Sequence, residues 1–147
     1  MDATSITFEI PGQPFPQPRA RMARNGHVYT PDNGIEGYKA AAIMAARIAA
    51  AGQAPSADAH AIDLEFVIER PPSHRRKDGS LTPKAPAWPP KRSGDWDNLC
   101  KGACDAITDS GSVWLDDDQV VEWSGRKRYA ADGEKPRTIV TIRRLAP

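Results

Sequence analysis

Residues Gly94–Trp123 read GDWDNLCKGACDAITDSGSVWLDDDQVVEW, and the rest of the chain is predicted to form a frame around them. Asp95 and Asp97 lie one residue apart where a loop is predicted to meet a helix that runs to about Asp109. Three more aspartates, Asp116–Asp118, precede an apolar run that is predicted as a strand. This stretch therefore predicts a helix and a strand that are each bordered by carboxylates.

The flanking sequence predicts the other elements of the fold. Segments that alternate apolar and polar residues have the period of a strand, and one segment is rich in alanine, the best helix former. The predicted elements are a strand at Ser5–Ile10, a helix at Asn33–Ala51, a strand at Ala61–Glu69, a helix at Asp97–Asp109, a strand at Gln119–Trp123 that continues into Arg126–Arg128, and a strand at Arg137–Arg143. This β-α-β-α-β-β order predicts an α/β (α+β) fold, in which a single mixed sheet of about four strands packs with two main helices.

Composition limits the class of protein. The 147 residues suit one domain, 1–147, and 39% hydrophobic with 27% charged residues is ordinary for a globular protein. No apolar run is long enough to span a membrane, and the first residues do not resemble a secretory signal, so a cytoplasmic location without membrane contact is expected. Cys100 and Cys104 lie one helical turn apart and are predicted to be buried free thiols.

The net charge of +1 conceals separate acidic and basic clusters, and local clusters are what attract a polyanion. Two proline-rich loops carry many of the bases, with Tyr29 in one and Trp88 in the other. Each loop has two interpretations, a contact with DNA phosphates and bases or a solvated surface loop. The candidate DNA-binding residues are Arg19, Arg21, Arg24, Arg75, Arg76, Lys77, Lys91, Arg92, Arg126, Lys127 and Arg128.

The clustered aspartates indicate a divalent cation. Carboxylates held close together repel one another, and Mg²⁺, which prefers hard oxygen ligands, removes that cost. Lys101 lies one turn beyond Asp97 on the same helical face, where an ammonium would stabilise a transition state. The alternatives are that Asp95 and Asp97 are cap and turn residues, that Lys101 bridges acids on an exposed face, and that Asp116–Asp118 form a solvated turn.

The two acidic blocks together resemble the signature of the RusA family of Holliday-junction resolvases. The family pattern D-x-D-N-L-x-K, a D-A-L-type helix and then L-x-D-D-x-Q-V is similar to DWDNLCK, DAI and WLDDDQV in this chain. The N-terminal segment PQPRARMARNGHVYTP resembles the version common in phage-derived members. The resemblance covers nearly the whole chain. It implies that the metal ligands are Asp95, Asp97 and Asp117, that Asp116 assists, and that Lys101 is the essential lysine.

The resemblance also implies an activity. Members of the family are homodimers that cut four-way DNA junctions with paired symmetric nicks, using Mg²⁺, with Mn²⁺ as a possible substitute, in DNA recombination and repair. An extra aspartate, Asp118, leaves the third ligand open among Asp116, Asp117 and Asp118. Two alternative functions stay open, a metal-dependent nuclease acting on other branched or duplex DNA, and a non-catalytic module that binds junctions or single strands.

Overall fold

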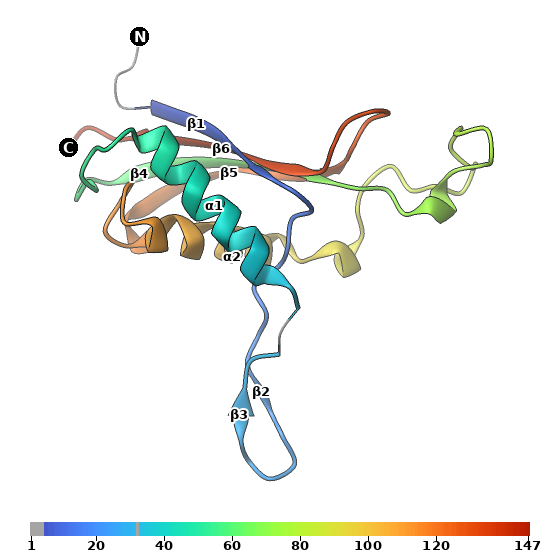
Figure 1. Ribbon diagram of the computed structural model, residues 1–147, viewed down its shortest axis with the longest axis horizontal. Helices are drawn as coiled ribbons and strands as arrows, with labels where there is room; N and C mark the ends of the chain where they lie inside the picture. The colour runs from blue at the N-terminus through green and yellow to red at the C-terminus, as the bar shows by residue number, and fades with distance from the viewer. Residues whose placement is uncertain (1–4, 32) are drawn as a thin grey trace.

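The computed structural model describes residues 5–31 and 33–147 and confirms the predicted α+β fold (Figure 1). The strands are β1 Ser5–Pro11, β2 Arg21–Met22, β3 Val28–Tyr29, β4 His60–Ile68, β5 Val120–Tyr129 and β6 Arg137–Arg144, and the helices are α1 Ile35–Ala50 and α2 Trp96–Ser110. Short 3₁₀ turns lie at η1 Pro72–His74, η2 Lys91–Ser93 and η3 Asp117–Gln119. Neither helix in the described ranges has the length and apolar content needed to cross a membrane.

The main sheet has the strand order β1-β6-β4-β5, with β4 and β5 parallel and the other pairs antiparallel. Both helices pack on one face of this sheet, and alternate strand residues such as Leu64, Phe66 and Val140 form the core with them (Figure 1). The predicted apolar face of α2 is buried, including both cysteines, which are free thiols. The core therefore fixes α2, and with it the first acidic block, against the sheet.

Trp96, the first residue of α2, anchors the helix start to the sheet. Its indole packs edge-on against Phe66, with ring centroids 5.5 Å apart. It also lies over Gly125 of β5, where a Cβ atom would come within 2.8 Å of the indole and 1.9 Å of the Leu64 carbonyl oxygen. Gly125 has a φ of +136°, so both its conformation and this close approach require glycine. The residues on either side of Trp96 are Asp95 and Asp97.

Two predicted helix starts differ in detail from the structure. Gly34, not Asn33, is the N-cap of α1, although the Asn33 side-chain oxygen still accepts a hydrogen bond from the backbone N–H of Ile35. Asp95, not Asp97, is the N-cap of α2, and Asp97 lies in the first turn. A local sequence pattern fixes a helix start only to within a residue or two. For α2, the packing of Trp96 on the sheet also helps to set the first residue.

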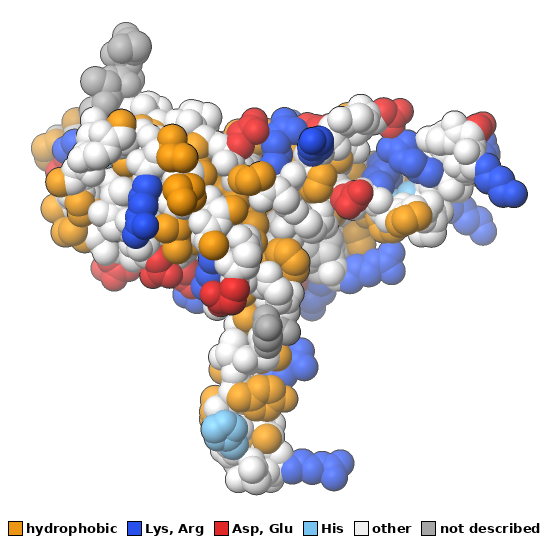
Figure 2. All heavy atoms as spheres, in the orientation of Figure 1, with side chains coloured by type: hydrophobic (Ala, Val, Ile, Leu, Met, Phe, Trp, Pro, Cys, Tyr) orange, Lys and Arg blue, Asp and Glu red, His pale blue; other side chains and the backbone are white. Residues whose placement is uncertain are grey.

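Two extensions leave the body of the protein (Figure 1). One is the β2–β3 hairpin, which projects from the region below α1. The other is the loop 69–92, which packs beside the turn between β5 and β6. Arg70 attaches this loop to the end of β5. Its guanidinium stacks on the Tyr129 ring, 4.3 Å from the centroid, and donates a hydrogen bond to the Pro86 carbonyl at 2.8 Å. Basic side chains gather along the loop 69–92, whereas on the hairpin they are isolated (Figure 2).

Candidate active site

The first acidic block converges on a single cationic nitrogen. Nη2 of Arg19 lies 3.9 Å from Asp95 Oδ2 and 3.5 Å from Asp97 Oδ2. The neighbouring Asn98 amide, oriented with its oxygen toward Arg19, accepts from Nε at 3.0 Å. The Asp95 side chain is 32% exposed and that of Asp97 is 73% exposed, so solvent and substrate reach both carboxylates. Both carboxylates therefore point toward the same cationic group.

A broad open groove of about 940 Å³ runs beside Asp95. Four basic side chains line it, together with proline, glutamine and asparagine residues from the N-terminal segment and from α2. These basic residues are Arg19, Arg21, Lys91 and Arg92. All four belong to the predicted DNA-binding set, and the structure brings them together from two loops that are far apart in sequence. A positively charged groove of this kind attracts a nucleic-acid phosphate backbone, and Asp95 lies in its wall.

The second acidic block lies beside a different part of α2. Burial, a hydrogen bond with Asp116 and the nearby charge of Asp105 raise the pKa of Asp117, while the ammonium of Lys101 opposes this shift. Lys101 Nζ lies 3.6 Å from Asp105 Oδ1. Asp117 is partly buried, whereas Asp116 and Asp118 are exposed. Of these three aspartates, Asp117 is therefore the one that interacts with the charged face of α2.

Asp105 was not among the predicted site residues, although a bridge from Lys101 to the acids on its helical face was one of the alternatives, and the structure contains the Lys101–Asp105 ion pair. Asp105 lies one helical turn beyond Lys101, as Lys101 lies one turn beyond Asp97, so the three share a face of α2. The four-residue spacing of Asp97, Lys101 and Asp105 was the sequence feature that could have identified Asp105. The structure adds that Asp105 contacts the ammonium of Lys101 and influences Asp117.

The carboxylates form two separate groups rather than a closed cage. Within residues 5–31 and 33–147, no three His, Cys, Asp or Glu side chains are close enough to hold a metal ion together. Mg²⁺ commonly uses only one or two carboxylates and takes its remaining ligands from water and substrate phosphates. The hard oxygens of Asp95 and Asp97, which already face one cation, fit such a site.

Several predicted DNA-binding residues form ion pairs within the protein. Arg75 pairs with Asp132 at 2.7 Å and donates to the Gly79 carbonyl. Arg126 and Arg128 both pair with Glu65, at 2.8 and 2.7 Å. These contacts fix the loop 69–92 and the outer strand β5, and they leave these arginines with part of their charge compensated. The exposed members of the predicted set are Arg19, Arg21, Arg24, Arg76, Lys77, Lys91, Arg92 and Arg126.

Lys127 holds the segment that precedes the first acidic block. Its ammonium donates to the carbonyl oxygens of Gly94, at 2.8 Å, and Pro90, at 3.2 Å. Gly94 directly precedes Asp95 and packs closely on Leu99, where a Cβ would come within 3.0 Å. Lys127 therefore stabilises the turn that leads into α2.

The fold therefore places the carboxylates at the start of α2 beside a groove lined by basic side chains. The sequence model of the endodeoxyribonuclease RusA family matches residues 11–143. The chain belongs to this family, as its sequence had indicated. A search of curated proteins found no match.

Proposed function

We propose that this endodeoxyribonuclease is a Mg²⁺-dependent resolvase that cuts four-way DNA junctions with paired symmetric nicks, and that it acts in recombination and repair. The observation that carries the proposal is the convergence of Asp95 and Asp97 on one cationic nitrogen at the head of a basic groove. Membership of the RusA family supports the nuclease activity and the branched substrate.

In this proposal, Asp95 and Asp97 hold the metal. Asp117, assisted by Asp116, is the third proposed ligand, and because the two blocks form separate groups in the structure, they would have to approach one another around the ion. Bound Mg²⁺, or Mn²⁺ in its place, would supply an activated water and compensate negative charge on the phosphodiester. Asp97 is in the first turn of α2, where the helix dipole favours negative charge.

Lys101 is proposed to stabilise the negative charge that develops at the phosphorus. Its side chain is exposed and lies on the same helical face as Asp97. Its ion pair with Asp105, at 3.6 Å, is partly exposed and therefore weak, so the ammonium is free to turn toward a phosphate. Asp105 then keeps Lys101 near the site when no substrate is bound.

DNA is proposed to approach along the groove between the N-terminal segment and the loop 69–92. Arg21, Lys91 and Arg92 would contact phosphates there, and Arg19 would exchange its carboxylate partners for a phosphate. Trp88, at 62% exposure on the loop 69–92, would stack on an unpaired base in this proposal. Such contacts recognise shape and charge more than sequence.

The proposal includes a homodimer, because two symmetric nicks require two active sites related by a two-fold axis. The mass of the protein in solution, with and without junction DNA, tests this part. A monomer that remains monomeric on the junction would rule out paired cleavage by a single assembly.

Cleavage of matched substrates tests the activity. A four-way junction, a fork and a linear duplex of the same sequence are incubated at one salt concentration with Mg²⁺, with Mn²⁺ or with a chelator. We expect cleavage of the junction only, and its loss with the chelator. Equal cleavage of forks or linear duplex would instead favour a general metal-dependent nuclease. Junction binding without product in either metal would favour a non-catalytic binding module.

A further inference from the structure

Gln119 lies in the second acidic motif, and the proposed chemistry gives it no role. Its side-chain amide has two acceptor positions and two N–H donors, and the structure uses all four. Oε1 accepts from the backbone N–H groups of Leu115, at 2.8 Å, and Asp116, at 2.9 Å. Nε2 donates to the backbone carbonyls of Ser56, at 2.8 Å, and Asp58, at 2.7 Å. One side chain thus joins the acidic block to a segment about sixty residues away.

The acidic block needs such a tie because little regular structure holds it. It consists of a single 3₁₀ turn, η3, between the buried Trp114 and the start of β5. Three consecutive aspartates repel one another and favour an open loop. The oxygen of Gln119 fixes the two backbone amides that immediately precede Asp117, and so it sets the direction in which this carboxylate leaves the chain.

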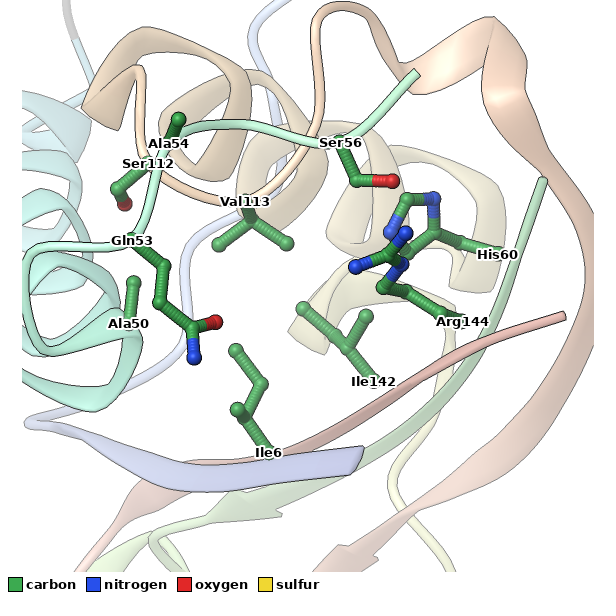
Figure 3. A pocket seen from close by; sticks show the side chains of 10 residues that line it. All are labelled: Ile6, Ala50, Gln53, Ala54, Ser56, His60, Ser112, Val113, Ile142 and Arg144. Atoms are coloured by element: carbon green, nitrogen blue, oxygen red, sulfur yellow. The ribbon is translucent and has the colours of Figure 1, made fainter. Parts of the chain in front are cut away.

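The segment on the other side of Gln119 is itself well anchored. The backbone N–H of Ser56 donates to the Val113 carbonyl at 2.9 Å, and Asp58 forms an ion pair with Arg144 at the end of β6. The side chains of Ser56, Val113 and Arg144 line a cavity of about 320 Å³, where His60 lies next to Arg144 (Figure 3). Gln119 therefore attaches the acidic turn to a segment that the sheet and the core already fix.

The chemistry at this position requires an amide of this length. Glutamate would keep the two acceptors but would place a further negative charge, without donors, against two carbonyl oxygens. Leucine would fill the space and leave both N–H groups and both carbonyls without these partners. Neither change alters the carboxylates themselves.

We propose that Gln119 is a positioning residue for cleavage, which holds Asp117 against the face of α2 that carries Lys101 and Asp105. This inference rests on the proposed function, since the positioned carboxylate is one of the proposed metal ligands. Gln119 contacts neither substrate nor metal in this account. It acts only through the backbone of residues 115 and 116.

The test compares Gln119→Glu and Gln119→Leu with the wild type and with Gln53→Glu. Gln53 is an exposed glutamine just before the anchored segment, so its change introduces the same charge away from the acidic block. In metal-free protein, we expect the amides of Leu115 and Asp116 to exchange hydrogen at least about tenfold faster in both Gln119 variants. Calorimetric titration with Mn²⁺ should show affinity reduced about 10- to 100-fold, as for other residues that orient metal ligands. Gln53→Glu should change neither quantity.

Two further measurements distinguish a positioning role of Gln119 from a general effect on stability. They are the affinity for junction DNA in the presence of a chelator and the midpoint of thermal unfolding. We expect both Gln119 variants to bind junction DNA as the wild type does, and high Mn²⁺ to restore part of their cleavage rate. Unchanged amide exchange and unchanged Mn²⁺ affinity in both folded variants would overturn the inference. If one variant does not fold, the other carries the test, and if both unfold, Gln119 is a general stability residue and the inference is wrong. A wild type that neither binds Mn²⁺ nor cuts junctions would instead contradict the proposed function, whatever the variants do.

Discussion

The two acidic blocks of this protein are held in opposite ways. Asp95 and Asp97 lie at the start of a long buried helix, and local sequence together with the packing of Trp96 sets their place. Asp116 and Asp117 lie in a short turn whose place depends on hydrogen bonds from Gln119 to a distant segment. A helix start can thus supply an acidic pair by local rules, whereas the turn with the third carboxylate is tied to a segment far away in the sequence.

The largest effect is expected in the first block. Asp97→Asn keeps the size of the side chain but removes the charge that would hold the metal, so the cleavage rate should fall by about 10³-fold or more. Junction binding should be retained or slightly tightened, because the groove loses a negative charge. Single-turnover cleavage and a gel-shift assay in chelator measure the two quantities. Cleavage by this variant at the wild-type rate would contradict the assignment of Asp97 as a metal ligand.

The second block gives a paired prediction that decides the register of the third ligand. Asp117→Asn should slow cleavage by about 10²-fold, whereas Asp118→Asn, which carries the same change on an exposed neighbour, should cut at nearly the wild-type rate. The partial burial of Asp117 and its interaction with Asp105 and Lys101 are the reasons. The same single-turnover assay measures both rates. The opposite ranking would show that Asp118, not Asp117, is the third ligand.

Lys101 lies on the helical face between the two blocks, and its replacement tests whether they work together. Lys101→Ala should reduce turnover by about 10²-fold with little loss of junction binding, because charge stabilisation in the transition state is lost. Lys101→Arg is the control that keeps the charge. Wild-type turnover by the alanine variant would mean that Lys101 only bridges to Asp105 on the surface.

Much of this arrangement could be predicted from sequence, and the limit has a physical cause. The periodicity of strands and helices predicted the four-stranded sheet and both main helices, because burial on one face leaves a local pattern. The placement of Asp97 and Lys101 on one face of α2 follows from helical spacing in the same way, whereas the roles of Asp95, Asp97 and Lys101 stay predictions. The pairing of Arg19 with both aspartates could not be predicted, since it joins a proline-rich loop to α2 across nearly eighty residues. The contacts of Gln119 are equally distant.

The basic residues illustrate the same limit. A run of positive charge looks uniform in sequence, yet Arg126 and Arg128 pair with Glu65 and Lys127 binds backbone carbonyls. Arg76 and Lys77 remain exposed. Only the folded chain separates a cation that stabilises the protein from one that is available to DNA.

Outside both acidic blocks, the expected effects are smaller. Lys77→Ala should weaken junction binding a few-fold and reduce the slope of log affinity against log salt by about 1, because one phosphate contact is lost. Lys39→Ala, on α1, is the control with the same loss of charge and should leave the slope unchanged. Binding measured between low and moderate salt tests this. An equal change in both variants would show a response to net charge alone.

The smallest effect concerns stability rather than cleavage. Hydrogen bonds from Arg128 lower the pKa of Glu134 to about 2, so the pair stabilises the fold above the ordinary carboxyl pKa of 4.5. This contribution declines as the pH falls toward 2. Glu134→Gln should therefore lower the urea midpoint at pH 7 and lower it less at pH 3, while junction cleavage changes little. Glu69→Gln, an exposed control, should show no such pH-dependent difference.

Two acidic blocks and a basic groove are proposed to form one site for symmetric cutting of branched DNA. Mapping the nicks on a four-way junction labelled on each strand in turn tests this proposal most directly. We expect nicks at symmetric positions in two opposing strands, formed with Mg²⁺ and absent with a chelator. Nicks at unrelated positions, or cutting that persists in the chelator, would contradict it.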